Sequence, residues 1–123
     1  MRRAVAAAAI VPALFLARSS LLQAATPAPT RIQVVAREYS FVLSRLRVKA
    51  GPAIVELVND GQDAHDLRLQ RAGSRHIAGI GTVASGRYAD LSLKLLPGRY
   101  SLWCSLANHR ALGMVATLIV TPR

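Results

Sequence analysis

Apolar and polar residues alternate along most of this chain in short runs that turn residues separate. In the first clear run, Ile32, Val34 and Ala36 fall on one side, and Pro97-Gly98 is one of the turn sequences between later runs. A period of two is typical of β-strands, in which successive side chains point to opposite faces. No long segment after residue 30 repeats with the helical period. The pattern therefore predicts an all-β sandwich.

Further runs show the same alternation. The glycine-rich stretch from Arg71 to Gly86 has few clear alternations, so there we expect a loop or a short helix. Elsewhere, one apolar side of each run is predicted to face the space between two sheets. The residues predicted to face inward are Leu46 and Val48; His65, Leu67 and Leu69; Leu91, Leu93 and Leu95; Tyr100, Leu102 and Cys104; and Met114, Ala116, Leu118 and Val120. In the second of these runs, Asp66, Arg68 and Gln70 are predicted to face solvent.

The N-terminus has the features of an export signal. Arg2 and Arg3 precede an apolar run from Ala4 to Ala17, and small residues follow at Ala24-Ala25. Such a run suits a signal-peptide core and is shorter than the roughly 20 residues that span a bilayer comfortably. We predict a signal peptide over residues 1–25 and a periplasmic or extracellular protein. The alternative is an uncleaved anchor that tethers the protein.

The predicted mature part consists of a short linker and one domain. Residues 26–30 (TPAPT) read as the linker, and residues 31–123 as the domain. Removing three N-terminal arginines lowers the formal charge from +10 to +7. The basic residues are scattered without interleaved aromatics, which argues against nucleic acid. The charge instead favours partners with acidic surfaces, and we expect a monomer.

The only cysteine of the chain, Cys104, lies on the apolar side of its run. His65 and Met114 lie on the apolar sides of theirs. His109 stands in the connecting loop, five residues after Cys104 and five before Met114. A thiolate, two imidazoles and a thioether suit copper in both oxidation states, whereas a structural zinc site would use more cysteines. These four residues are therefore the candidate ligands of one metal ion.

Two segments resemble the signatures of the cupredoxins, the small blue-copper electron carriers. CSLANHRALGM resembles their C-terminal Cys-x₄-His-x₄-Met signature, and NDGQDAHD resembles the upstream turn that carries the first histidine. The resemblance implies a Greek-key β-sandwich and one copper held by His65, Cys104, His109 and Met114. Many relatives have Pro-Gly before the loop histidine, where this chain has Ala107-Asn108. Because asparagine tolerates left-handed backbone, we expect Asn108 to supply that turn.

Several neighbours of the candidate ligands are predicted to support them. Asp66 follows His65 and Ser105 follows Cys104, so we expect a hydrogen bond between their side chains that clamps the two ligand segments. Trp103 is predicted to point away from the core, either as a second electron exit or as an ordinary strand aromatic packed on a loop. The small and apolar residues around His109, which would form a docking patch, are Leu106, Ala107, Ala111 and Leu112.

The expected function is one-electron transfer between redox partner proteins. The alternative is copper handling outside the cytoplasm, which the same ligands could perform. We do not expect an enzyme or a small-molecule substrate. Catalysis by a Cys-His nucleophile pair would need an Asn or Asp that orients the histidine, and it would give Met114 no role. The sequence shows neither such an orienting residue nor a catalytic role for Met114. His76 matches neither signature and is expected to lie on the surface.

Overall fold

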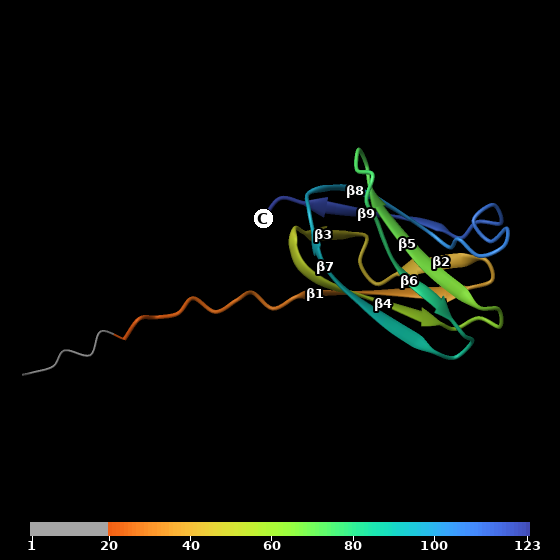
Figure 1. Cartoon of the computed structure of the whole chain (residues 1–123), viewed down its shortest axis with the longest axis horizontal. Helices are drawn as coiled ribbons and strands as arrows, with labels where there is room; N and C mark the ends of the chain where they lie inside the picture. Colours follow the sequence, from red (N-terminus) through yellow and green to blue (C-terminus); the bar gives the residue numbers. More distant parts are fainter. Residues whose placement is uncertain (1–19) are drawn as a thin grey trace, which may run out of the picture.

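The computed structural model describes residues 20–123. The predicted signal peptide lies mostly in residues 1–19, outside the described residues. Residues 20–29 are extended and exposed and precede the first strand, which begins at Thr30, the last residue of the predicted linker (Figure 1). Between residues 20 and 123 no helix has the length and hydropathy needed to cross a membrane.

The described chain forms strands that pack as two sheets (Figure 1). One sheet has four strands in the order β2-β1-β4-β7, and the other has five in the order β3-β9-β8-β5-β6. This arrangement confirms the predicted all-β sandwich. The strands are β1 (Thr30–Arg37), β2 (Ser40–Leu43), β3 (Arg47–Lys49), β4 (Gly51–Asn59), β5 (His65–Arg71), β6 (Ile77–Val83), β7 (Tyr88–Leu95), β8 (Gly98–Trp103) and β9 (Val115–Thr121).

The two ends of the sandwich differ in what they carry. Strands β1 and β4 pair in parallel and β3 pairs in parallel with β9, whereas the other neighbours are antiparallel. We call the end where β4 begins the distal end, and the end where it stops at Asn59 the site end. Residues 20–29 and the C-terminus leave from the distal end, and the β8–β9 connection lies at the site end (Figure 1).

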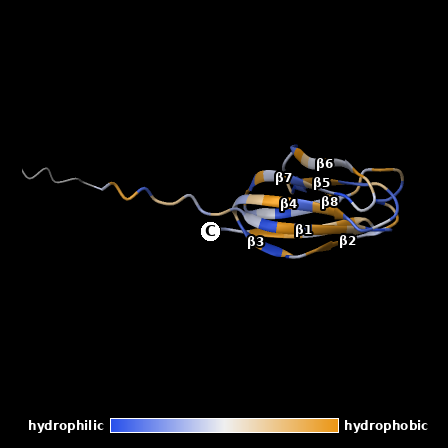
Figure 2. Cartoon of the chain, turned by 90° about the horizontal axis from the view of Figure 1, so that it is seen from below, coloured by the Kyte–Doolittle hydropathy of each residue, from blue (hydrophilic) through white to orange (hydrophobic). Residues whose placement is uncertain are grey.

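The core lies between the sheets and follows the alternation seen in the sequence. Ile32, Val34 and Ala36 are buried on β1, while their neighbours on that strand are more exposed. Figure 2 shows that this strand combines hydrophobic and hydrophilic residues. Burial of such apolar surface stabilises the fold by about 25 cal/mol per Å². Every described strand and every buried core residue lies between Thr30 and Thr121, so residues 26–123 contain the complete sandwich.

Two inward or outward assignments from the sequence were wrong. Leu46 is 66% exposed and lies before β3, which spans only three residues, of which Val48 alone is buried. Asp66, predicted to face solvent, is buried. The register between β5 and β6 shifts between His65 and Leu67, and this irregularity interrupts strict alternation.

The stretch 71–86 contains a strand and no short helix. It holds β6, an edge strand that pairs with β5 alone. Of this strand only Ile80 and Val83 are buried, because its other residues lie at the rim of the sandwich. Weak burial leaves weak alternation, which is why sequence pattern did not detect β6.

We expect the metal-free protein to fold. The core is continuous between the sheets, and of the candidate ligands only Cys104 and Met114 belong to it, so most of the core is formed without them, unlike that of a zinc finger. A bound metal should raise the melting temperature, because it binds the native state preferentially. Circular dichroism melts of residues 26–123 with and without Cu(II) check both points. A random-coil spectrum for the metal-free protein would contradict the first.

Candidate metal centre

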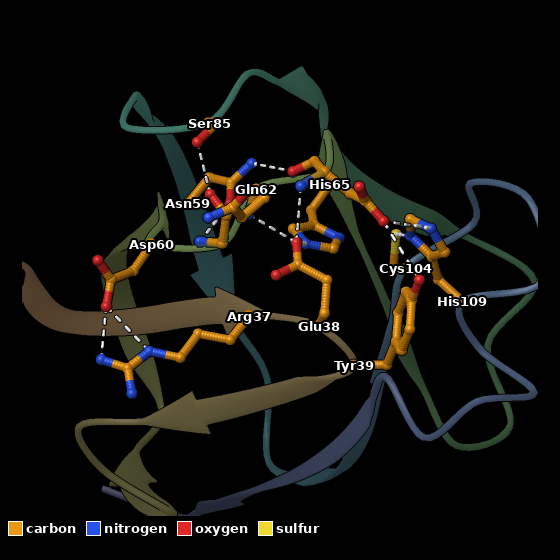
Figure 3. A network of polar contacts seen from close by, with 12 residues as sticks. Arg37, Glu38, Tyr39, Asn59, Asp60, Gln62, His65, Ser85, Cys104 and His109 are labelled. Atoms are coloured by element: carbon orange, nitrogen blue, oxygen red, sulfur yellow. Dashed lines mark hydrogen bonds and ion pairs between the residues drawn. The ribbon is translucent and has the colours of Figure 1, made fainter.

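Three side chains far apart in sequence meet at the site end. His65 is the first residue of β5, Cys104 directly follows β8, and His109 lies in the turn between β8 and β9. One ligand atom from each lies within 4.8 Å of the others, and all three residues are buried (Figure 3). The three side chains are therefore positioned to bind one metal ion.

The imidazole of His65 presents a free nitrogen to this cluster. Its Nε2 lies 3.0 Å from Oε1 of Glu38. Because a carboxylate only accepts, Nε2 carries the proton in neutral His65 and Nδ1 keeps its lone pair. Nδ1 is buried and has no hydrogen-bond partner. Buried polar atoms are nearly always satisfied, so an orphaned acceptor beside a thiol and a second imidazole fits a metal ligand.

Cys104 and His109 face each other across the cluster. Sγ of Cys104 lies 3.6 Å from Nδ1 of His109. Burial raises the pKa of the Cys104 thiol, because a thiolate would lose its hydration there. A metal cation at this point would supply the opposing charge and stabilise the thiolate. The site thus favours a bound metal over a free, reactive cysteine.

Met114 lies beside both of these residues. Its backbone N–H donates to the carbonyl of His109 at 3.1 Å, and its carbonyl accepts from the N–H of Cys104 at 3.2 Å. Its side chain is fully buried. These bonds close the β8–β9 connection into a compact loop, with Cys104 and Met114 side by side at its base. A thioether so placed is compatible with a weak additional ligand.

The backbone of this loop differs from the prediction at one position. The left-handed residue is Ala107, with φ of 42°, and Asn108 does not take that role. Gly113 also has positive φ, at 118°. The strain expected for alanine in this conformation is about 1–2 kcal/mol. The backbone bonds of the turn, including His109 N–H to the carbonyl of Leu106 at 3.1 Å, hold it there.

Asp66 and Ser105 are hydrogen-bonded as the sequence indicated. The hydroxyl of Ser105 donates to Oδ2 of Asp66, and the Ser105 N–H donates to Oδ1 at 2.6 Å. Arg68 also lies 3.4 Å from Oδ2. One buried carboxylate therefore joins the segment that follows Cys104 to the strand that carries His65.

We expect Ser105→Ala to destabilise this connection. The change leaves Oδ2 of the buried Asp66 without its hydroxyl donor, a loss of about 1–3 kcal/mol of unfolding free energy. Copper should also dissociate faster, since the two ligand segments are then less firmly joined. Urea unfolding and copper-release kinetics measure these effects. Ser101→Ala, an exposed position on the neighbouring strand, is the control; equal effects from both variants would contradict the clamp.

Glu38 is the main residue that the sequence did not reveal. Its Oε1 accepts from the N–H groups of Gln62 and Asp63 at 2.8 and 2.7 Å, besides contacting His65 (Figure 3). These two backbone bonds lower the pKa of Glu38 to about 2, so the carboxylate stays ionised. A side chain at Gly61 would collide with this carboxylate. Glu38 therefore fixes both the β4–β5 loop and the orientation of His65.

Asp63 and Tyr39 stand on the outer side of His109. Oδ2 of Asp63 lies 3.9 Å from His109 Nε2 and accepts from the Tyr39 hydroxyl at 3.2 Å. The negative charge of Asp63 raises the pKa of Tyr39. The rings of Tyr39 and His109 have centroids 5.0 Å apart. In both imidazoles of the cluster, Nδ1 therefore lies on the side of Cys104, and a carboxylate lies near Nε2. That carboxylate belongs to Glu38 for His65 and to Asp63 for His109.

The remaining predicted residues surround this centre at the surface. The guanidinium of Arg110 lies 4.6 Å above the ring of Trp103, so that aromatic packs under the loop. Leu106 is half-buried, and Ala107, Ala111 and Leu112 are exposed, the last at 49%. His76 is exposed in the β5–β6 turn and does not join the cluster.

No protein-family profile and no curated protein matches this sequence. Solved structures do match. Reduced auracyanin from Roseiflexus castenholzii is 18% identical, with a TM-score of 0.68, and the match covers 78% of this chain and all of that one. Auracyanin A of Chloroflexus aurantiacus, a "blue" copper protein, is 17% identical with a TM-score of 0.66 and coverage of 76% and 100%. Reduced rusticyanin is 21% identical with a TM-score of 0.61 and coverage of 77% and 82%.

These matches cover 76–78% of this chain, and they agree with the fold that its two signature segments implied. The chain therefore has the cupredoxin fold.

Proposed function

We propose that this protein is an exported mononuclear blue-copper protein that carries single electrons between redox partner proteins. The observation that carries the proposal is the buried, unpartnered Nδ1 of His65, which faces the thiol of Cys104 and the imidazole of His109. Met114 would complete the ligand set. When bound there, copper would supply a reversible one-electron couple.

The donor atoms support copper over other metals. One sulfur and two imidazole nitrogens, with a thioether beside them, combine groups that favour Cu(I) with groups that accept Cu(II). Hard cations such as Mg²⁺ and Ca²⁺ prefer oxygen ligands, and no carboxylate belongs to the cluster of His65, Cys104 and His109. The similar structure of a "blue" copper protein, auracyanin A, also supports this choice.

Burial favours an electron carrier over a copper-handling protein. Cys104 and His65 are fully buried, and His109 is 8% exposed. Delivery of a metal to another protein needs ligands that a partner can reach, whereas electron transfer needs only close approach of a ligand edge. The hydrogen bonds of Glu38 and Asp66 hold the ligand segments in place, so little should rearrange when the charge of the metal changes.

Partners would dock at the site end, around His109. Leu112 and Ala111 are exposed there, and a small apolar patch suits a brief encounter. The net charge of +7 attracts partners with acidic surfaces over distance. At the docking end itself, Asp63 and Arg110 carry opposite charges, so a partner with a nearly neutral contact surface should also dock there.

One experiment tests the function directly. Adding Cu(II) to residues 26–123 should give one equivalent of bound copper and an intense visible absorption from the thiolate–copper bond. Cyclic voltammetry should then show reversible one-electron cycling, and nuclear magnetic resonance should show fast self-exchange. Bound copper that exchanges readily as Cu(I) with a chelator, but cycles slowly, would favour copper handling instead.

Electron exits are tested by two substitutions. Leu112→Glu places a charge in the docking patch and should slow transfer to partners by about tenfold or more, because docking is weakened. Trp103→Leu should slow transfer to one of two unrelated partners while leaving the absorption spectrum unchanged. Stopped-flow transfer to both partners measures this, with Leu46→Glu, an exposed leucine before β3, as the control. If only Leu112→Glu slows transfer, all electrons pass through the edge of His109, and Trp103 is not a second exit.

A further inference from the structure

The positive charge of this protein is concentrated far from the metal centre. Four of its six acidic residues lie at the site end, and the other two, Glu56 and Asp90, are cross-strand neighbours on β4 and β7. Strands β3, β8 and β9 and the residues up to the C-terminus contain none. The distal part of the five-stranded sheet is therefore free of acidic residues.

Five cations gather in this acid-free region. Arg45, Arg47 and Lys49 line one open groove, and Lys49 lines a second groove with Arg123. Arg47 and Arg99 both pair in register with Ile119, from opposite sides, so they flank one position of β9. We call these five residues the distal basic cluster. They are Arg45, Arg47, Lys49, Arg99 and Arg123.

Protection of the sheet edge does not account for the whole cluster. Cations on an edge strand discourage pairing with another chain, which would explain Arg47 and Lys49 on β3. Arg99, however, lies on the interior strand β8, and Arg45 and Arg123 lie outside the strands. Mutual repulsion among five cations that have no acidic side chain among them disfavours the compact state, and a negatively charged surface would relieve it.

The position of the N-terminal segment indicates which negatively charged surface this is. Residues 20–29 leave the sandwich at the distal end (Figure 1), and Ala28 and Thr30 line the same groove as Lys49 and Arg123. The sequence before them contains the apolar run Ala4–Ala17. The segment that we predict to be a signal peptide, or alternatively an uncleaved anchor, therefore precedes the end of the sandwich that carries the cluster. The cluster contains no aromatic residue on which the bases of a single-stranded nucleic acid could stack, which favours a lipid surface over that partner.

We propose that the distal basic cluster lies on the surface of a membrane that contains anionic lipids, with the metal centre facing away from it. Each Lys or Arg close to such a surface is attracted by the phosphate groups of the lipids, by about 1 kcal/mol, and clusters of four to eight cations are typical of segments that bind anionic lipids. The opposite end then remains open to other proteins. This inference shares with the proposed function the predicted export of the chain, and it does not depend on copper or on electron transfer.

Vesicle binding by residues 26–123 tests the proposal. The domain should sediment with vesicles of phosphatidylglycerol and phosphatidylcholine, should not sediment with phosphatidylcholine alone, and should be released by salt. Neutralising Arg45, Arg47 and Lys49 together (Arg45→Gln, Arg47→Gln, Lys49→Gln) should weaken binding by roughly 100-fold. The matched control neutralises three exposed arginines at the opposite end, as Arg37→Gln, Arg87→Gln and Arg110→Gln, and should change binding much less.

Three outcomes would overturn the proposal. Equal weakening by both triple variants would show that net charge alone attracts the domain. Unchanged vesicle binding together with dimers of the first variant would show that the cations guard the β3 edge. The fluorescence of the single tryptophan reports the orientation of the bound domain. Because Trp103 lies at the site end, iodide should still quench its fluorescence in the vesicle-bound state. Loss of this quenching would place the site end on the lipid.

Discussion

Cys104→Ser is expected to abolish the visible absorption of the copper-loaded protein. The band arises from the bond between thiolate and copper, and serine has no sulfur to form it. Cys104 is fully buried and lies 3.6 Å from Nδ1 of His109, so no other thiol can take its place. The chain has no second cysteine. Absorption titration with Cu(II) measures the effect directly.

A control separates loss of the ligand from loss of the fold. Serine is slightly smaller and more polar than cysteine, so the variant is compared by circular dichroism with the unmodified metal-free protein. Ser101→Cys places a thiol on the exposed side of β8, away from the cluster. Combined with Cys104→Ser, it should not restore the band. A strong thiolate band in Cys104→Ser alone would overturn the assignment of the metal centre.

Glu38→Ala is expected to weaken copper binding by about 10- to 100-fold, the range typical for partners that orient metal ligands. The substitution removes the acceptor that fixes the proton of His65 on Nε2. It also releases the N–H groups of Gln62 and Asp63, so the loop before His65 loses its support. The imidazole can then rotate or exchange tautomers, and Nδ1 faces the metal for less of the time. Competition with a chelator of known affinity measures the change.

Glu56→Ala is the matched control for this prediction. Glu56 is the same residue type on β4, where it accepts one hydrogen bond from Gln33 and lies outside the metal centre. Glu38→Gln keeps an acceptor oxygen but removes the charge, so an intermediate affinity would separate hydrogen bonding from electrostatics. Nitrogen-15 nuclear magnetic resonance of the metal-free protein should show His65 protonated at Nε2, and a mixture of tautomers in Glu38→Ala. Equal affinities of Glu38→Ala and Glu56→Ala would contradict this role.

The sequence by itself determined the fold class and the types of the candidate ligands. Period-two alternation reflects the geometry of a strand, which holds whatever the strand packs against. It therefore predicted the buried face of β1 and the inward side chains of His65 and Cys104. The order of Cys104, His109 and Met114 within eleven residues is equally local, because one loop carries them.

The local sequence pattern did not predict strands or burial correctly where these depend on neighbouring strands or on irregular strand pairing. Strand β6 alternates weakly because it lies at an edge with little burial. Asp66 is buried because the pairing of β5 is irregular beside it, and because Ser105, far along the chain, covers its carboxylate. Neither feature has a periodic signature, since each depends on which segment lies next to which.

Only the tertiary structure decided what surrounds the ligands and where the charges gather. Glu38 reaches His65 across 27 positions because β1 pairs in parallel with β4, so that both strands end at the same side of the sandwich. The distal basic cluster forms because β3, β9 and β8 are adjacent in one sheet, which brings Arg47 and Arg99 to either side of Ile119. Alternation specifies a face of each strand but not its neighbours. The order of strands, set by packing of the whole core, specifies the rest.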